Sequence, residues 1–215
     1  MKYGRTYHLP FSKGATSDDR IATNSDNLIG REIVITEKLD GSNTAITKDG
    51  VFGRSHADYT KNPWDVKTWE LWNRINRDIN DGVYLFGEGM YAIHSIEYSK
   101  LTSPFYLFGV RDNNIWVTWD EVEEYSYLLD IPTAPVLFRG VVNSFNELKT
   151  LVEDLTKKSS NLGGELEGVV VRSAGIFHND DFGDNVQKWV RENHVQTDIH
   201  WQKNWKPAKI NYEWK

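Results

Sequence analysis

The sequence predicts an α+β domain in which antiparallel strands outnumber helices. Three observations indicate this class: short apolar or alternating runs recur along the chain, few segments have helical periodicity, and the spacing between runs suits hairpin connections. No internal repeat, low-complexity tract or linker rich in proline and glycine divides the 215 residues. With nine Trp, ten Tyr and nine Phe, the chain is expected to bury a substantial core.

Strands are expected where β-branched, aromatic and apolar residues cluster between turn-forming residues. In chain order these runs cover residues 31–38, 43–47, 50–54, 83–88, 105–110, 114–118, 135–138, 167–172 and 186–191.

The helical segments are predicted from N-terminal signals and from apolar spacing. Residues 63–80 begin after an asparagine with a proline, which favours the first turn of a helix. Their apolar stripe is made by Trp69, Trp72, Ile75 and Ile79. Two further helices are expected after Thr118 and Ser144, because a glutamate follows each of them three residues later as in a capping box. The last helix is expected to bury Phe145, Leu148, Val152 and Leu155.

The composition excludes several classes of site. The chain has no cysteine, so it forms no disulfide framework, thiolate nucleophile or cysteine zinc site. No segment has the apolar length of a signal peptide or a membrane span, and we therefore expect a cytoplasmic protein without a membrane partner. The six histidines are scattered and predict no metal site.

The formal net charge of −6 argues against a generally basic surface that binds nucleic acid. The last fifteen residues, in contrast, are predominantly basic and aromatic. Residues 201–215 alternate lysines with aromatic residues, a pattern that either binds nucleic acid or docks its tryptophans on the domain. We predict one main domain over residues 1–200, a basic and aromatic tail over 201–215, and no separate C-terminal domain.

Residues 37–43 contain a candidate nucleophile, Lys38, at the end of a predicted strand. A free lysine is protonated near neutral pH, and its amine attacks only where burial or nearby cations lower its pKa. Asp40 and Gly41 predict a tight turn that holds this side chain at the mouth of a cleft.

Five later segments carry further chemistry. Arg54 ends a short strand, and Glu88 lies between glycines at the end of another. An aromatic strand contains Phe108, Glu167 begins a run of valines, and Lys188 lies on a strand that also carries Arg191. Each of these residues taken singly is typical of a surface or a core position, but their common order along the chain is informative.

This order resembles that of the covalent nucleotidyltransferase superfamily, which includes ATP-dependent DNA and RNA ligases and mRNA capping enzymes. Within it, residues 30–195 are most similar to RNA ligases of the RNA ligase 2 type. This similarity rests on Glu37 before the lysine, on Asn43, on the aromatic segment 105–110 and on the segment 188–195. One departure is that Lys188 is followed by Trp189 and Val190, where the family usually has a second lysine. The resemblance implies an antiparallel-sheet nucleotidyltransferase domain, similar to the ATP-grasp fold.

The resemblance also implies an activity and its residues. It implies an ATP-dependent RNA ligase, with Lys38 forming a lysyl–AMP intermediate and passing AMP to a 5′-phosphate end that a 3′-hydroxyl then attacks. ATP is the co-substrate, Mg²⁺ (or Mn²⁺) the metal, and Glu167 its ligand. Cations that include Lys188 and the metal are expected to lower the pKa of Lys38. The residues implied to bind the nucleotide are Glu37, Asp40, Asn43, Arg54, Glu88, Phe108 and Lys188.

The implied partners are RNA ends, including those of a nicked duplex, and an end-healing kinase or phosphatase. Two alternatives stay open: a minimal ATP-dependent DNA ligase, and a nucleic-acid-binding module that keeps the fold without the chemistry.

Overall fold

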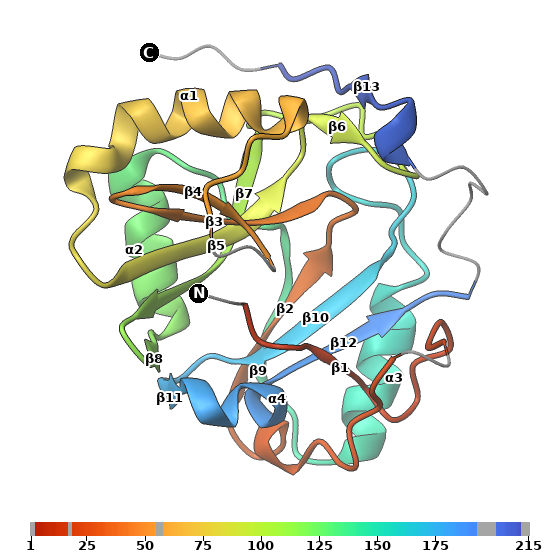
Figure 1. The fold of residues 1–215 in the computed structure, drawn as a ribbon. Coiled ribbons are helices and arrows are strands. Elements are labelled where there is room, and N and C mark those ends of the chain that lie inside the picture. Colours follow the sequence, from red (N-terminus) through yellow and green to blue (C-terminus); the bar gives the residue numbers. More distant parts are fainter. Residues whose placement is uncertain (1–2, 17–18, 55–57, 193–200, 212–215) are drawn as a thin grey trace.

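The chain forms two main sheets that face each other, with helices on their outer sides (Figure 1). The structure is a computed structural model, and it describes residues 3–16, 19–54, 58–192 and 201–211. One sheet has the strand order β1 (Tyr7–His8), β12 (Val186–Val190), β10 (Gly168–Ser173), β2 (Glu32–Lys38) and β9 (Val136–Val141). The other has the order β11 (Phe177–His178), β8 (Ile115–Trp116), β7 (Phe105–Asp112), β5 (Val83–Gly89), β3 (Ser42–Thr47) and β4 (Gly50–Gly53).

The strand pairing within the described residues is antiparallel except at one edge, where β1 runs parallel to β12. A small third sheet pairs β6 (Ala92–Ile93) with β13 (Lys206–Pro207). The predicted α+β class with antiparallel sheets is therefore confirmed. The nine predicted strands correspond to β2, β3, β4, β5, β7, β8, β9, β10 and β12.

The helices cover the outer faces of the two sheets. Helices α1 (Val66–Ile75) and α2 (Trp119–Leu129) pack on the six-stranded sheet, and α3 (Phe145–Leu155) packs on the five-stranded sheet. A single-turn helix, α4 (Phe182–Asn185), precedes β12. Short 3₁₀ turns lie at η1 (Asp26–Leu28), η2 (Pro63–Asp65), η3 (Asn76–Asp78), η4 (Asn179–Asp181) and η5 (Trp201–Lys203).

The helix signals in the sequence act as expected at α2 and, in part, at α3. Thr118 and Glu121 form a reciprocal capping box at the start of α2. Ser144 accepts a hydrogen bond from the Glu147 amide at the start of α3. The expected burial of Phe145 is wrong, because this residue is the first of α3 and is 39% exposed, with its ring 5.5 Å from the Phe11 ring between centroids.

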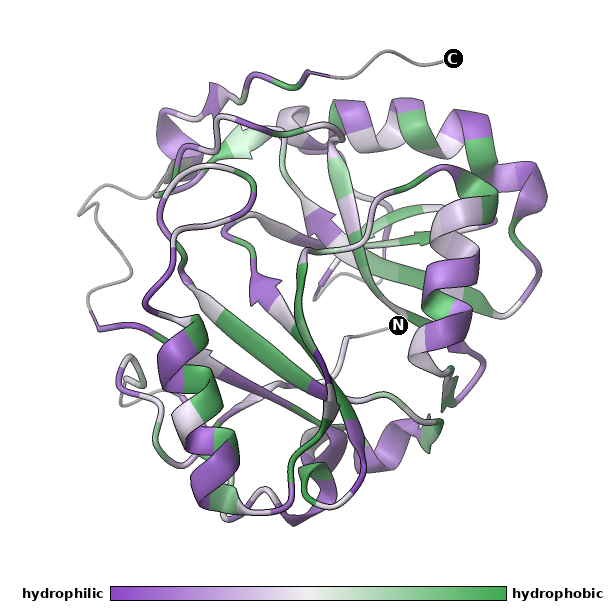
Figure 2. Cartoon of the chain, turned by 180° about the vertical axis from the view of Figure 1, so that it is seen from behind, coloured by the Kyte–Doolittle hydropathy of each residue, from purple (hydrophilic) through white to green (hydrophobic). Residues whose placement is uncertain are grey.

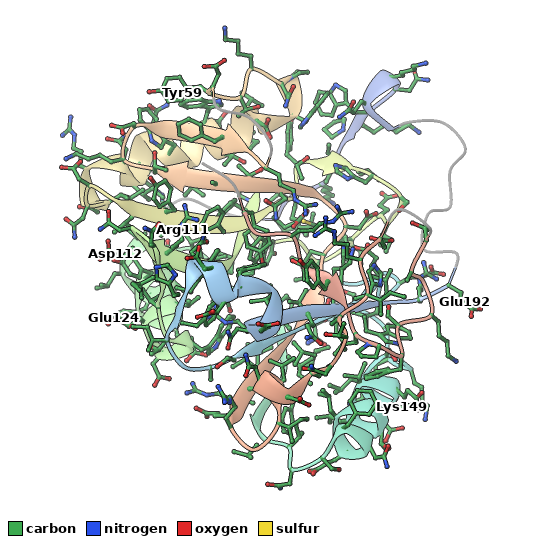
Figure 3. All side chains as sticks on the ribbon, turned by 60° about the horizontal axis from the view of Figure 1, so that its bottom comes forward. Tyr59, Arg111, Asp112, Glu124, Lys149 and Glu192 are labelled. Atoms are coloured by element: carbon green, nitrogen blue, oxygen red, sulfur yellow. The ribbon has the colours of Figure 1, made fainter. Side chains whose placement is uncertain are left out.

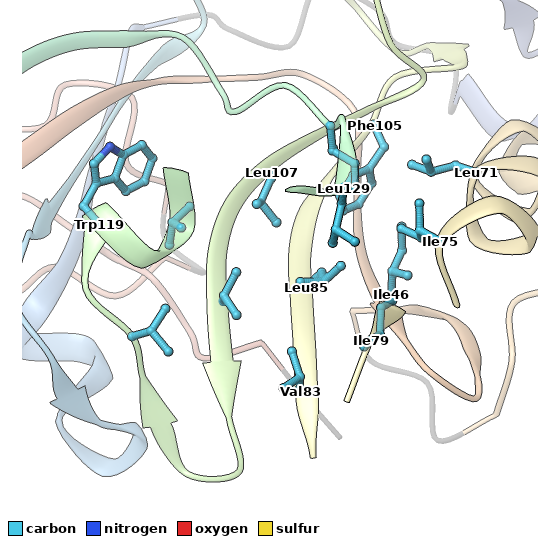
Figure 4. Close-up of a cluster of buried hydrophobic side chains, with 14 of the residues drawn as sticks. Ile46, Leu71, Ile75, Ile79, Val83, Leu85, Phe105, Leu107, Trp119 and Leu129 are labelled. Atoms are coloured by element: carbon cyan, nitrogen blue, oxygen red, sulfur yellow. The ribbon is translucent and has the colours of Figure 1, made fainter. Parts of the chain in front are cut away.

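The main hydrophobic cluster joins α1 and α2 to the six-stranded sheet (Figure 4). Leu71 and Ile75 of α1 belong to it together with Ile46 and Leu85 of the sheet, and all four are at most 2% exposed. Burial of one such side chain contributes roughly 1.5–3 kcal/mol. A second cluster lies between α3 and the five-stranded sheet.

Polar residues of the helices lie away from these clusters. Figure 2 shows purple and green residues alternating along α2 and α3, whereas the strands behind them are largely green. In Figure 3, Glu124 of α2 and Lys149 of α3 lie on the outside of the molecule, and both side chains are exposed. No helix within the described residues is long and apolar enough to cross a membrane.

The described part of the tail packs on the domain. Trp205 lies 5.8 Å from Tyr91 and 6.3 Å from Trp64, measured between ring centroids. Strand β13 pairs with β6, and Ile210 packs against a buried cluster. This packing favours the docking interpretation for Trp205, whereas Lys203, Lys206 and Lys209 are exposed. The predicted contributions of Tyr212, Trp214 and Lys215 and of the Trp201 side chain lie outside the described residues.

The elements that sequence reasoning missed are short. Strands β1, β6, β11 and β13 have two residues each, and α4 has four. Segments of this length contain no periodicity, and they form because neighbouring segments offer backbone partners.

Candidate active site

A cavity of about 380 Å³ lies between the two sheets. The five-stranded sheet and the residue that follows β2 contribute Thr36, Glu37, Lys38, Leu39, Val170, Arg172, Val186 and Lys188 to its walls. The segment from the turn after β2 to β8 contributes Gly41, Asn43, Arg54, Glu88, Phe108 and Trp116. Tyr3, Thr6, Ala134 and Phe182 complete the lining.

Strand alternation aims Lys38 and Lys188 at the cavity. In β10, Val169 and Val171 belong to the cluster under α3, so Val170 between them faces the other sheet. Val170 is paired with Lys188 of β12 and with Thr36 of β2. Lys38 lies two residues beyond Thr36 and therefore on the same face of the sheet.

The turn after Lys38 transfers the chain from one sheet to the other. Strand β2 belongs to the five-stranded sheet and β3 to the six-stranded sheet, so the predicted turn is a crossover and not a hairpin. A Cβ atom at Gly41 would lie 2.6 Å from the Gly89 carbonyl oxygen, and glycine is required by this close approach. The crossover places Lys38 where the two sheets meet.

Lys38 is paired with Glu167. Its Nζ lies 2.7 Å from Oε1 of the buried Glu167 carboxylate. Burial disfavours the ammonium, but Glu167 and Glu88 more than offset this effect, and the pKa of Lys38 is raised above its ordinary value. The protein's own groups therefore raise this pKa, because the carboxylates outweigh burial, and the expected lowering by Lys188 together with a bound metal stays a prediction.

Glu88, at the end of β5, has an unusual ionisation. Burial raises its pKa to about 8, even though Lys38 acts in the opposite direction. Near neutral pH the Glu88 carboxyl group is thus largely protonated, and it can donate as well as accept a hydrogen bond.

Phe108 reaches the cavity because β7 contains a bulge. Phe86 pairs with Gly109 and Gly87 pairs with Leu107, which leaves Phe108 as the extra residue. The Phe108 carbonyl accepts a hydrogen bond from the buried Arg172 guanidinium at 3.4 Å. The bulge therefore aims an aromatic ring into the cavity while Leu107 stays in the core.

Asn43 and Arg54 lie at the cavity on the side of the six-stranded sheet. The Asn43 Oδ1 atom is buried and makes no hydrogen bond in the described part of the chain. A buried acceptor without a donor is unfavourable by about 1–3 kcal/mol, which suits a site completed by a ligand. Arg54 is exposed, as expected for a cation at the entrance.

Asp40 and Glu37 are engaged with the chain itself. Asp40 does not line the cavity, and its Oδ2 accepts hydrogen bonds from the Ser95 amide and hydroxyl and from the Ile96 amide at 2.7–2.8 Å. Glu37 lines the cavity, but its carboxylate accepts hydrogen bonds from the Ser160 hydroxyl and the Asn161 amide. Both carboxylates hold loops beside Lys38, and nucleotide contact by either stays a prediction.

Several lining residues carry no sequence signal. Tyr3 lies 5.2 Å from the Phe108 ring, with the two rings nearly perpendicular. Arg172 is buried on backbone carbonyls, and desolvation lowers its pKa to about 10. Thr6, Trp116 and Phe182 belong to no recognised pattern.

The carboxylates suit a metal that is held mainly by a substrate. No group of three or more histidines or carboxylates within the described residues is arranged to hold an ion. Mg²⁺ usually binds one or two carboxylates together with substrate phosphates. Glu167 does not itself line the cavity, but it contacts Lys38 of the cavity wall, and together with the orphaned Asn43 Oδ1 of that wall it fits such a shared site.

Solved structures of ligases have a similar fold. An RNA ligase from Naegleria gruberi has a TM-score of 0.54 at 20% identity, over 80% of this chain and 52% of that one. An archaeal ATP-dependent RNA ligase has a TM-score of 0.61 at 11% identity, over 90% of this chain and 49% of that one. A putative ATP-dependent DNA ligase from Aquifex aeolicus has a TM-score of 0.58 at 15% identity, over 90% of this chain and 50% of that one. The chain thus spans about half the length of these proteins.

Comparison with curated protein sequences gives no match. The sequence model of the RNA ligase family, in contrast, matches residues 31–190, from the start of β2 to the end of β12. This range includes Lys38, Glu88, Phe108, Glu167 and Lys188. The chain belongs to the RNA ligase family.

Proposed function

We propose that the protein is an ATP-dependent RNA ligase that joins a 5′-phosphate end to a 3′-hydroxyl end through a lysyl–AMP intermediate. The observation that carries the proposal is the Lys38 side chain, paired with Glu167 at 2.7 Å, at a cavity that also receives Lys188, Glu88 and Phe108. Membership of the RNA ligase family supports this chemistry. The N. gruberi RNA ligase has been solved with ATP and Mn, in agreement with ATP as co-substrate and a divalent metal.

The first step is attack of the neutral Lys38 amine on the α-phosphorus of ATP. An N–P bond forms, the bond from the α-phosphorus to the bridging oxygen breaks, pyrophosphate leaves, and the nitrogen releases a proton to solvent. The amine must lose its proton first, since an ammonium has no lone pair. A divalent metal shared by Glu167 and the phosphates would supply positive charge that lowers the amine pKa and stabilises the phosphate oxygens.

The next two steps transfer AMP and then release it. An oxygen of the RNA 5′-phosphate attacks the AMP phosphorus, the N–P bond breaks, and Lys38 recovers its proton. The RNA 3′-hydroxyl then attacks the activated 5′-phosphorus, its proton goes to solvent, and AMP leaves as the phosphodiester forms.

Each remaining side chain has a role suited to its position. Lys188 neutralises charge on the α-phosphate, which is the main task in phosphoryl transfer. Glu88 hydrogen-bonds the ribose hydroxyls, and Phe108 stacks on adenine. Arg54, at the entrance, pairs with a phosphate of AMP or of the strand. Asn43 Oδ1 accepts a hydrogen bond from the bound nucleotide or joins the shared metal site.

The test is covalent labelling of the protein. With α-labelled ATP and Mg²⁺ or Mn²⁺, we expect an acid-labile adduct that survives denaturation, with GTP as the control nucleotide. Lys38→Ala removes the amine and Lys38→Arg cannot supply a neutral one, so neither variant should be labelled. Lys149→Ala, an exposed lysine of α3, is the matched control and should label normally. Labelling of Lys38→Ala would remove this residue from the nucleophile role.

A minimal DNA ligase is the second candidate, because the Aquifex aeolicus protein has a similar fold. Side-by-side reactions on nicked duplexes with RNA or DNA at the nick separate the two. We expect faster joining at RNA 3′-hydroxyl ends, and equal activity on all-DNA nicks would contradict the RNA preference. An end-healing kinase or phosphatase is a proposed partner, since the reaction requires a 5′-phosphate and a 3′-hydroxyl.

A further inference from the structure

A segment that precedes the family match pairs with β12, the strand that carries Lys188. We define the N-terminal segment as residues 3–16 and 19–22, whereas the family match begins at residue 31. Within it, β1 pairs with β12, and His8 is the register partner of Lys188. The Leu9 amide donates a hydrogen bond to the Lys188 carbonyl at 2.7 Å, and the Gly14 amide donates one to the Val190 carbonyl at 2.8 Å. The segment therefore has a defined position beside the active site.

The N-terminal segment places a carboxylate on Lys188. Oδ1 of Asp19 lies 3.2 Å from the Lys188 Nζ. The other oxygen, Oδ2, accepts hydrogen bonds from the Thr16 amide and hydroxyl at 3.1 and 3.0 Å. The carboxylate is thus oriented by its own loop, and the flexible lysine side chain is held against it.

His8 supports the same carboxylate from the side of the sheet. Its Nε2 lies 3.2 Å from Asp19 Oδ1, and its Nδ1 lies 2.8 Å from the Ser12 hydroxyl oxygen. The Ser12 hydroxyl in turn accepts a hydrogen bond from the Val190 amide of β12. His8 is 1% exposed, so this arrangement is built into the protein interior.

The charges around Lys188 indicate what the Asp19 carboxylate does. Burial lowers the pKa of Lys188, and the neighbouring cations Lys38 and Arg54 lower it further. Asp19 acts in the opposite direction and favours the ammonium form. A lysine that must neutralise phosphate charge has to stay protonated, and Asp19 is the group that offsets the two cations.

We propose that Asp19 is a positioning residue of the nucleotide site, which holds the Lys188 ammonium charged and oriented toward the phosphates of ATP, with His8 fixing Asp19. The inference rests on the proposed function, because it assumes that ATP phosphates meet Lys188. It also extends the site beyond residues 31–190, to a segment that the family match does not include.

A double-mutant cycle tests the proposal. Dissociation constants for ATP are measured in a Lys38→Ala background, which blocks transfer, for Asp19→Asn, Lys188→Met and the double variant. We expect Asp19→Asn to weaken ATP binding about tenfold, since the variant loses the charge-assisted hydrogen bond that holds the Lys188 ammonium. When Lys188 is already Met, Asp19→Asn should change the affinity less than about twofold.

Two further variants separate positioning from folding. Asp19→Glu keeps the charge and should retain ATP affinity within about threefold of the parent protein. Asp26→Asn, an exposed carboxylate of η1, is the matched control and should bind ATP like the parent protein. Thermal unfolding of every variant shows whether the fold persists.

The outcomes are distinct. Equal weakening by Asp19→Asn with and without Lys188 would mean that Asp19 acts only on folding, and tighter binding would mean that it competes with phosphate; either result overturns the proposal. Absence of a lysyl–AMP adduct in the wild-type protein would instead overturn the proposed function. An adduct in the wild type together with unchanged ATP affinity in Asp19→Asn would overturn this inference alone.

Discussion

Ionisable side chains at the cavity are held in environments that shift their pKa values in different ways. The pKa of Glu88 is raised by burial, and the pKa of Lys38 is raised because nearby carboxylates outweigh burial. Lys188 is shifted the other way by burial and by Lys38. One cavity thus combines a carboxyl group whose neutral form is favoured, a lysine paired with a carboxylate and a second lysine whose ammonium form is disfavoured by burial.

The raised pKa of Glu88 predicts a pH-dependent stability difference. The folded protein holds the Glu88 proton up to about pH 8, whereas the unfolded chain loses it near the ordinary value of 4.5. The contribution of Glu88 to the free energy of unfolding is therefore fully present at low pH and declines as the pH rises toward 8. Glu88→Gln cannot ionise, so its stability relative to wild type should increase with pH, by on the order of 1 kcal/mol or more.

Denaturant unfolding of both proteins across this pH range measures the effect. Glu124→Gln, an exposed position of α2, is the control and should give a difference that does not change with pH. A pH-independent difference between Glu88→Gln and wild type would contradict the burial of an ionisable group at this position.

Phe108 is predicted to contribute stacking energy to ATP binding. Phe108→Leu keeps an apolar side chain but removes the aromatic face, and we expect a loss of about 1–3 kcal/mol in ATP affinity. Phe108→Trp preserves the face and should bind ATP far better than the leucine variant. Equilibrium binding measures the ATP affinity of each variant. Thermal unfolding checks whether loss of the ring contact with Tyr3 destabilises the fold. Equal affinities in the two variants would argue against stacking.

At the scale of elements, strand alternation and one bulge decide which side chains reach the site. Lys38, Val170 and Lys188 share a face of the five-stranded sheet because their positions are related by the strand period and by the pairing register. Phe108 reaches the same cavity only through the bulge in β7. Helices α1, α2 and α3 contribute to stability from the outer faces and none of their residues lines the cavity, whereas α4 contributes Phe182.

The cap of α2 is predicted to affect stability without affecting chemistry. Thr118→Ala removes a side chain that accepts a hydrogen bond from the Glu121 amide, and it should lower the free energy of unfolding by about 1 kcal/mol. The rate of adduct formation should not change, because Thr118 does not line the cavity. Thr150→Ala, on the exposed face of α3, is the control, with an expected effect within about 0.5 kcal/mol. Denaturant unfolding and labelling rates together check this.

At the scale of the whole molecule, the site exists because the two sheets and the N-terminal segment meet. The N-terminal segment adds Tyr3, Thr6 and Asp19 beside the cavity. The described part of the tail covers a different region, around Tyr91 and Trp64. The two ends of the chain therefore have separate roles in the fold.

Trp205 is predicted to anchor the tail. Trp205→Ala removes the ring contacts with Tyr91 and Trp64, and it should lower the free energy of unfolding by about 1–2 kcal/mol. Adduct formation should stay unchanged, since Trp205 does not line the cavity. Lys203→Ala, a neighbouring exposed position, should leave stability unaffected. Unchanged stability in Trp205→Ala would mean that the docking contributes nothing to the fold.

Much of the fold and part of the site were predictable from local signals. Strand runs such as residues 83–88 and the capping box at Thr118 depend on neighbours in sequence, and the structure has both. The structure also brings Lys38, Glu88, Phe108 and Lys188 to one cavity. The raised pKa of Lys38 was not predictable, because it depends on how closely Glu167 and Glu88 approach the buried lysine.

The α+β class, the order of the strands along the chain and the family follow from local patterns, because periodicity, caps and motif order depend on residues that are close in sequence. Two contacts depend instead on the three-dimensional arrangement: Lys38 pairs with Glu167, which lies 129 positions later, and Asp19 reaches Lys188, 169 positions away. The tertiary structure also decided that Asp40 and Glu37 hold loops and that a bulge aims Phe108 inward. The physical reason is that such contacts depend on sheet order and register, which long-range pairing selects.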